Sequence, residues 1–174
     1  LYSITIGSFS TTIKPTVDGL VKDNLPYKGF IFIGLIVVEN EPMVIEYNVR
    51  MGDPETEVVL PRLKTDLLEI FQAIDNECLN EIEIEIDPQT AVTVMLVSGG
   101  YPEAYDKEKE ITGLENVKES IVFHAGATKA DGKLVTNGGR VLTVTSLGDD
   151  FRSALESSYK SIENIKFEAM NYRT

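Results

Sequence analysis

Residues 29–55, GFIFIGLIVVENEPMVIEYNVRMGDPE, decide how this chain folds. The first ten are almost all β-branched, aromatic or aliphatic, a composition typical of a strand buried on both faces. Residues 39–42 then form a polar turn that contains a proline, and residues 43–50 alternate between apolar and polar types. The pattern therefore predicts an antiparallel hairpin.

Two helices are expected on either side of this hairpin. Residues 12–22 have apolar side chains at helical spacing, and the Leu25-Pro26 pair that follows disfavours helix continuation. Residues 65–74 carry an amphipathic stripe, with Thr65 and Asp66 as the N-terminal cap. Asp53 followed by Pro54 also predicts a helix start directly after the hairpin.

The acidic run at residues 81–87, closed by Pro88, marks the expected domain boundary, giving domains 1–88 and 89–174. Beyond it, we expect strands at residues 91–97, 121–125 and 140–146, a helix at 149–165 and a last strand starting at 165–167. Asp131-Gly132 and Asn137-Gly138-Gly139 are typical of turns. Hairpins in sequence plus one long helix predict an antiparallel α+β fold.

Composition and net charge argue against several classes of protein. The chain has 174 residues, with 16 Lys+Arg and 28 Asp+Glu, so its formal net charge is −12, which argues against nonspecific nucleic-acid binding. Its longest apolar stretch, residues 30–38, is too short for a membrane-spanning helix. The single cysteine, Cys78, excludes an internal disulfide and fits the reducing conditions of the cytoplasm.

Polar side chains are concentrated at the end of the hairpin. Glu46, Asn48 and Arg50 are two residues apart in sequence, so a strand would present them on one face. Asp53 and Glu55 follow in a sharp turn. Mg²⁺ prefers oxygen ligands and leaves positions open for phosphates, while arginine matches phosphate geometry. Spacing alone leaves two readings open: a metal and phosphate site, or a solvated strand face.

Longer motifs favour the first reading. YKGFIFIGL and VIEYNVRMGDPETEVVLPRL, followed by SGGYPEAY and FHAGATKADGKLVTNGGRVLTVTSLG, closely resemble glycinamide ribonucleotide synthetase (phosphoribosylamine–glycine ligase), an ATP-grasp enzyme family of purine biosynthesis. The resemblance runs from about Ile13 to the end. It implies the C-terminal part of an ATP-grasp domain, an antiparallel sheet with helices, followed by a small barrel-sandwich-like α+β domain.

The resemblance also implies an activity: joining glycine to 5-phosphoribosylamine with ATP, through an acyl phosphate. Glu46 and Asn48 match the Mg²⁺ or Mn²⁺ ligands that hold ATP, and Arg50 matches an ATP-binding and catalytic arginine. Asp53 and Glu55 match the turn beside the reacting centre and are the other catalytic candidates. Asp53 and Arg140 are the candidates for substrate binding.

Departures from the family pattern shape two further expectations. Gly34 stands where related enzymes often carry another metal carboxylate, so fewer protein ligands are expected. The nucleotide-covering lid would lie upstream, so we expect a fragment that needs the N-terminal half of the enzyme and is inactive alone. The alternative is a noncatalytic binding or carrier-type module of barrel-sandwich fold, with Lys133 beside a turn, although no methionine flanks that lysine.

Overall fold

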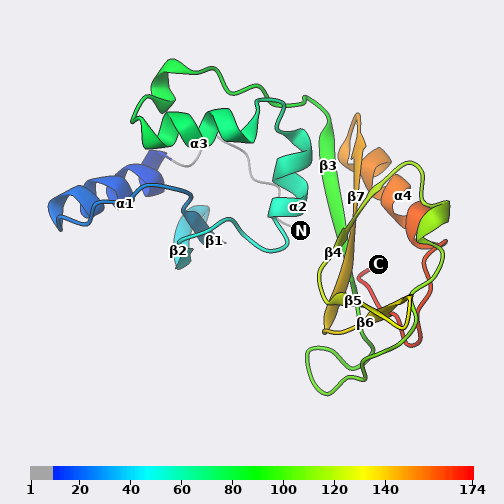
Figure 1. Cartoon of the computed structure of the whole chain (residues 1–174). Coiled ribbons are helices and arrows are strands. Elements are labelled where there is room, and N and C mark those ends of the chain that lie inside the picture. Colours follow the sequence, from blue (N-terminus) through cyan, green and yellow to red (C-terminus); the bar gives the residue numbers. More distant parts are fainter. Residues whose placement is uncertain (1–9) are drawn as a thin grey trace. The chain divides into compact units, whose positions relative to one another are not determined.

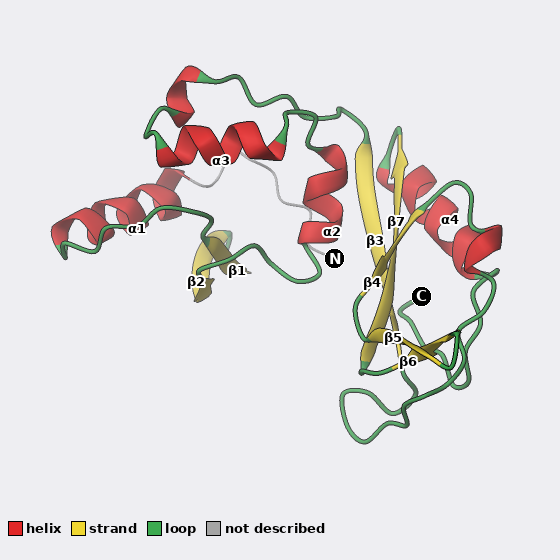
Figure 2. Cartoon of the chain, in the orientation of Figure 1, coloured by secondary structure: helices red, strands yellow, loops and turns green. Residues whose placement is uncertain are grey.

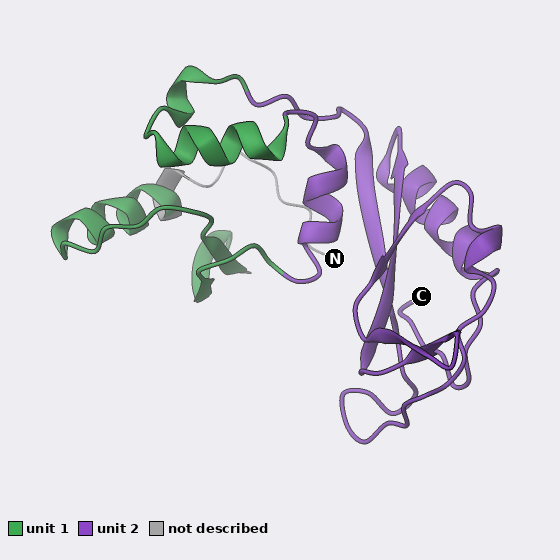
Figure 3. Cartoon of the chain, in the orientation of Figure 1, with its two compact units in different colours: residues 1–52, 66–83 green, residues 53–65, 84–174 purple. Residues whose placement is uncertain are grey.

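The computed structural model describes residues 10–174 (Figure 1), and Figure 2 separates its helices from its strands. The chain divides into two compact units (Figure 3). The first contains the described residues up to Gly52 together with Asp66–Glu83, and the second contains Asp53–Thr65 together with Ile84–Thr174. The α+β class expected from the sequence is confirmed, whereas the domain boundary near residue 88 stays a prediction.

The first unit contains the predicted hairpin. Strand β1 (Phe32–Val38) pairs antiparallel with β2 (Glu41–Asn48). The turn between them is shorter than expected: Glu39 and Asn40 both have positive φ, 51° and 65°, the combination that two-residue hairpin turns require. The proline predicted to lie in the turn, Pro42, instead pairs with Val37.

The expectation that the first strand is buried on both faces is wrong for its second half. Gly34 is buried, but Ile36, Val37 and Val38 are exposed, Val37 by 66%. In the described part of the chain β1 pairs only with β2, and a two-stranded ribbon cannot cover both of its own faces.

Helices α1 (Ser10–Lys22) and α3 (Leu67–Asp75) complete most of this unit, with a short 3₁₀ turn, η3 (Leu79–Glu81). The predicted cap of α3 is confirmed: the Asp66 side chain accepts a hydrogen bond of 2.7 Å from the Leu68 backbone N–H. The buried residues of α3 are Ile70 and Ala73, whereas Leu68 is exposed although it is an apolar residue of the predicted amphipathic segment 65–74.

The second unit is built on a three-stranded antiparallel sheet in the order β3-β7-β4. Its strands are β3 (Thr90–Val97), β4 (Ile121–His124) and β7 (Arg140–Gly148), and helix α4 (Phe151–Ile162) packs against β3 and β7. A separate hairpin joins β5 (Ala127–Ala130) to β6 (Lys133–Thr136). The core consists of fully buried apolar side chains: Leu96, Val141, Leu142, Val144, Ala154, Ile162 and Ile165.

One expectation for this unit is not confirmed, and two others need correction. The barrel-sandwich detail is not confirmed, since the described sheets are open and small. No strand starts at Ile165; only an isolated bridge joins Lys166 to Thr112, while Ile165 is buried in the core. The helix after Pro54 is the single turn α2 (Thr56–Val59), which continues into η2 (Leu60–Arg62), and Asp53 does not cap it, because Glu55 occupies the cap position.

Candidate functional site

The candidate metal ligands lie at the end of β2. Glu46 pairs with Gly34 and Asn48 pairs with Phe32, so both strands advance by two residues between the pairs. Side chains two residues apart along a regular strand point to the same face. The structure therefore brings Glu46 and Asn48 to one face of the hairpin.

A β-bulge interrupts the strand just before Glu46. The register shifts between Gly34 and Leu35, because Leu35 pairs with Val44 and leaves Ile45 without a partner. The alternation expected from the sequence placed Val44 on the face of Glu46, and the extra residue breaks that pattern. Bulges often redirect a side chain next to a functional site, and this one directly precedes the candidate ligand.

Gly34 gives the Glu46 side chain its space. A Cβ atom at Gly34 would lie 2.7 Å from Glu46 Cγ and 3.3 Å from its Oε1, so the Glu46 side chain extends across the glycine. The carboxylate of Glu46, on the neighbouring strand, thus covers position 34. Gly34 is a close-approach glycine, and a larger residue there must displace Glu46.

These two side chains fit the needs of a divalent cation. The Glu46 carboxylate is exposed, and in the described part of the chain neither it nor the Asn48 amide has a side-chain partner. Mg²⁺ commonly binds only one or two protein ligands when phosphates and waters complete its coordination shell, and one carboxylate plus one amide oxygen meets that requirement. Across residues 10–174, no three His, Cys, Asp or Glu side chains form a metal-binding cluster, so any metal would depend on further donors.

Arg50 follows the strand in a bend and has an exposed side chain. Its Nη1 donates a hydrogen bond of 3.0 Å to the Met51 carbonyl oxygen. This local bond leaves the other N–H groups of the guanidinium for an anion, because the group has five donors.

Asp53 and Arg140, the candidate substrate-binding pair, are brought together within the second unit. Arg140 Nη2 lies 2.9 Å from Asp53 Oδ2, and Nη1 donates a hydrogen bond of 3.0 Å to the Asp53 carbonyl oxygen. Their side chains remain 38% and 53% exposed. Three of the five donors of Arg140 are left for another ligand. Glu55 lies nearby in sequence with its side chain exposed.

The backbone that immediately precedes Arg140 is held by contacts to Gly138 and Gly139, which sequence reasoning missed. A Cβ at Gly139 would overlap Cδ2 of Tyr101, so the tyrosine ring packs directly on that glycine. Ser98 donates its hydroxyl to the Gly138 carbonyl at 2.9 Å and its backbone N–H to the Gly139 carbonyl at 2.8 Å. The two glycine-rich motifs SGGYP and NGGR thus meet and fix the start of β7. The sequence predicted only a turn there.

Glu57 is a second residue that sequence reasoning missed. Its Oε2 is buried without a hydrogen-bond partner in the described structure. Burial raises the pKa of Glu57, and the nearby carboxylates of Asp53 and Glu55 add to this effect, against opposing contributions from its own backbone N–H and from Arg140. A signal was present in the sequence, since three acidic residues alternate at positions 53, 55 and 57.

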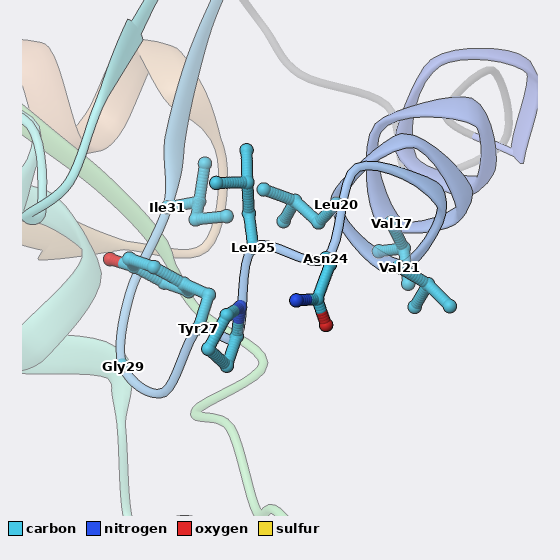
Figure 4. Close-up of a pocket in the computed structure, with 9 residues that line it drawn as sticks. Val17, Leu20, Val21, Asn24, Leu25, Tyr27, Gly29 and Ile31 are labelled. Carbon is cyan, nitrogen blue, oxygen red and sulfur yellow. The ribbon is translucent and has the colours of Figure 1, made fainter.

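The first unit also contains a cavity of about 520 Å³ next to the C-terminal end of α1 (Figure 4). Leu20, Leu25 and Ile31 line it, together with the Tyr27 ring. Its lining is mostly apolar and carries no charged side chain, so it lacks the groups that would bind a phosphate.

The described helices include none that is long and apolar enough to span a membrane.

Comparison with known families identifies the chain. The family model for the phosphoribosylglycinamide synthetase C domain matches residues 91–174, and the model for the ATP-grasp (A) domain of the same enzyme matches residues 6–56. The chain belongs to the phosphoribosylglycinamide synthetase family. The resemblance found in the sequence motifs is therefore confirmed.

Curated relatives of this synthetase family agree in sequence. The chain is 47% identical over 161 residues to phosphoribosylamine–glycine ligase from Caldanaerobacter subterraneus subsp. tengcongensis, and the match covers 92% of the chain and 39% of the relative. It is 46% identical over 166 residues to the trifunctional purine biosynthetic protein adenosine-3 of Gallus gallus, covering 94% of the chain and 17% of that protein. The chain thus spans well under half of either relative.

One solved structure supports the same family, and a second supports the fold. The crystal structure of phosphoribosylamine–glycine ligase from Thermotoga maritima superposes with a TM-score of 0.82 and 35% identity, over 99% of the chain and 44% of that protein. N5-carboxyaminoimidazole ribonucleotide synthetase from Thermotoga maritima superposes with a TM-score of 0.58 and 18% identity, over 93% of the chain and 43% of that protein, which shows a shared fold alone.

The carrier-type alternative is not favoured for this member of the synthetase family. Lys133 lies directly after the Asp131-Gly132 turn, where a carrier would present a modifiable lysine. Its Nζ instead forms an ion pair of 2.8 Å with Glu110. Both side chains are largely exposed, so this ion pair is weak, and it is the family match of both parts of the chain that disfavours a carrier.

Proposed function

We propose that this chain supplies the metal-holding hairpin and a substrate-binding pair of a phosphoribosylamine–glycine ligase. This ATP-dependent enzyme of purine biosynthesis forms the carbon–nitrogen bond between glycine and 5-phosphoribosylamine. The observation that carries the proposal is the Glu46 carboxylate, which crosses Gly34 on the same hairpin face as Asn48 and has no protein partner in the described structure. Family membership supports ATP and Mg²⁺ or Mn²⁺ as cofactors.

The proposed reaction has two steps. A glycine carboxylate oxygen attacks the γ-phosphorus of ATP, ADP leaves, and glycyl phosphate forms. The amine of 5-phosphoribosylamine then attacks the carbonyl carbon, inorganic phosphate leaves, and the nitrogen loses a proton. Both steps concentrate negative charge on phosphate oxygens, so catalysis depends on positioning and on positive charge near those oxygens.

Residues of the first unit serve the phosphate side of this chemistry. Glu46 and Asn48, both in the paired ladder of β1 and β2, would hold a divalent cation through their side-chain oxygens. When bound, the cation neutralises charge on the phosphates of ATP. Arg50 is exposed at the end of the same strand, and its guanidinium can bind the oxygens of the transferring phosphoryl group in two-point geometry.

Residues of the second unit serve the phosphoribosyl substrate. Arg140 keeps free donors for the substrate phosphate while Asp53 fixes the orientation of its guanidinium. Asp53 uses only Oδ2 in this pair, so its other oxygen can accept a hydrogen bond from the substrate amine. Asp53 and the exposed Glu55 are the candidates to accept the proton that the amine loses.

The rest of the enzyme completes this proposal. The bacterial relative is longer than this chain, which covers 39% of it, and we assign the remaining ATP contacts to that additional length. Activity therefore requires the N-terminal half of the ligase as a partner, and the chain alone is inactive. A cytoplasmic location also remains a prediction.

The test uses a full-length ligase that carries this segment. Glu46→Ala and Asn48→Ala each raise the Mg²⁺ concentration needed for half-maximal rate, by about 10-fold, because each removes one of the protein's oxygen ligands. Glu41→Ala is the matched control, since Glu41 is an exposed glutamate on the same strand that pairs with Val38 at the other end of the hairpin. An unchanged Mg²⁺ dependence in Glu46→Ala would overturn the metal assignment.

A further inference from the structure

Glu57 is a partly buried acidic residue in the second unit. Its Oε2 is buried and has no hydrogen-bond partner in the described structure. A carboxylate with one buried, unpaired oxygen is costlier in its charged form than in its neutral form. The geometry alone therefore favours a proton on Glu57.

The charges around Glu57 lead to the same conclusion. Helix α2, which contains Glu57, packs against β3 and β7. Strand β3 has no titratable residue, and the only charged residue of β7 is Arg140. Asp53 and Glu55 lie on the segment before α2, and Arg62 in η2 is already bound to the Asp87 carbonyl at 3.0 Å. If every carboxyl were ionised, Asp53, Glu55 and Glu57 would share the Arg140 guanidinium, the one cation left over in the described elements that pack against α2.

We propose that Glu57 is a positioning residue for the Asp53–Arg140 pair and that it acts in its neutral form. With Glu57 neutral, Asp53 is the carboxylate that Arg140 contacts, and the guanidinium keeps both of its hydrogen bonds to Asp53. When Glu57 loses its proton to solvent, a second carboxylate competes for the same guanidinium. Deprotonation of Glu57 therefore pulls Arg140 away from Asp53.

The functional consequence of this inference rests on the proposed function, in which Asp53 and Arg140 bind the substrate. A neutral Glu57 keeps the donors of Arg140 directed outward and avoids an additional negative charge next to a substrate phosphate. Phosphate binding at Arg140 is then strongest while Glu57 holds its proton and weakens as the pH rises. Burial also raises the pKa of Glu57, which extends the pH range of the neutral form.

NMR spectroscopy of the 174-residue chain tests the inference. With ¹³C-labelled carboxyl groups, Glu57 is expected to titrate above the usual range of a glutamate, and the Nε–H signal of Arg140 is expected to shift in the same step. Glu57→Gln, a nearly isosteric and permanently neutral variant, is expected to abolish the shift of Arg140. Glu55→Gln, which removes the same charge from an exposed side chain two residues away, is expected to retain it.

Two results would overturn the inference: titration of Glu57 within the usual range of a glutamate, or survival of the Arg140 shift in Glu57→Gln. Ribose 5-phosphate, added to the same samples, separates this inference from the proposed function. If the Arg140 shift behaves as expected but ribose 5-phosphate leaves the Arg140 signal unmoved, the positioning role of Glu57 stands and the substrate-binding role of the pair is wrong.

Discussion

Gly34→Ala changes the candidate metal site by one methyl group. The substitution lies on β1, opposite Glu46, in a ladder that the change leaves hydrogen-bonded. Carbon atoms in contact normally lie about 3.5–4.0 Å apart. The added Cβ would lie 2.7 Å from Glu46 Cγ, so Glu46 must turn away from the position it occupies across the glycine.

The two consequences differ in size. Glu46 is exposed and flexible, so it can relieve the overlap by leaving its preferred rotamer, at a cost of about 0.5–1.5 kcal/mol in the free energy of unfolding. The carboxylate, however, no longer points where it did beside Asn48. Displacing a ligand in this way weakens divalent-cation binding by about 10-fold, a larger effect than the small loss of stability suggests.

Two measurements on the 174-residue chain follow these consequences. Urea unfolding gives the change in stability, and titration with Mn²⁺, followed through the electron paramagnetic resonance signal of the free ion, gives the change in affinity. Gly19→Ala is the matched control, because a Cβ there meets no atom within 4 Å in the interior of helix α1. That control should raise the free energy of unfolding by up to about 1 kcal/mol and leave Mn²⁺ binding unchanged.

The reasoning is refuted if Gly34→Ala binds Mn²⁺ as tightly as the parent chain. Such a result would mean that the carboxylate position over Gly34 has nothing to do with a metal. A large loss of stability, comparable to unfolding of the hairpin, would refute a different step, namely that Glu46 is free to move aside.

Three further predictions concern the second unit and α3. Arg140→Lys replaces the two-point contact with Asp53 by a single charge and should weaken ribose 5-phosphate binding by about 10-fold in an NMR titration. Because burial raises the pKa of Glu57, the folded chain holds that proton more tightly than the unfolded chain. The free energy of unfolding should therefore fall as the pH rises between the unfolded and folded pKa values, and urea unfolding at several pH values should show that Glu57→Gln removes this fall. Asp66→Ala deletes the cap of α3 and should lower the free energy of unfolding by about 1 kcal/mol, whereas Asp66→Asn should restore it.

The hairpin could be predicted from the sequence because its signals are local. Alternation, a polar turn and β-branched residues each act within a few positions, and the Asp66 cap is equally local. The bulge at Ile45 could not be predicted, since an unpaired apolar residue resembles its paired neighbours. The exposure of Val37 could not be predicted either, because burial depends on what else covers the strand.

The contact between Asp53 and Arg140, the candidate substrate-binding pair, could not be predicted from local sequence patterns. Asp53 and Arg140 are 87 positions apart in sequence, and no local pattern indicates that they meet. Asp53 next to a proline was predicted to be a helix cap, but its carboxylate binds Arg140 instead. The packing of Tyr101 on Gly139 likewise depends on a contact between distant motifs. Family resemblance, not spacing, pointed to Asp53 and Arg140.

Locating a bound Mn²⁺ ion tests the central claim most directly. Mn²⁺ added to the ¹⁵N-labelled chain broadens amide signals near the ion through paramagnetic relaxation. The account predicts selective broadening at Gly34, Glu46 and Asn48, with loss of this broadening in Glu46→Gln and its retention in Glu41→Gln. Broadening centred elsewhere, or broadening at the hairpin that persists in Glu46→Gln, would contradict the account.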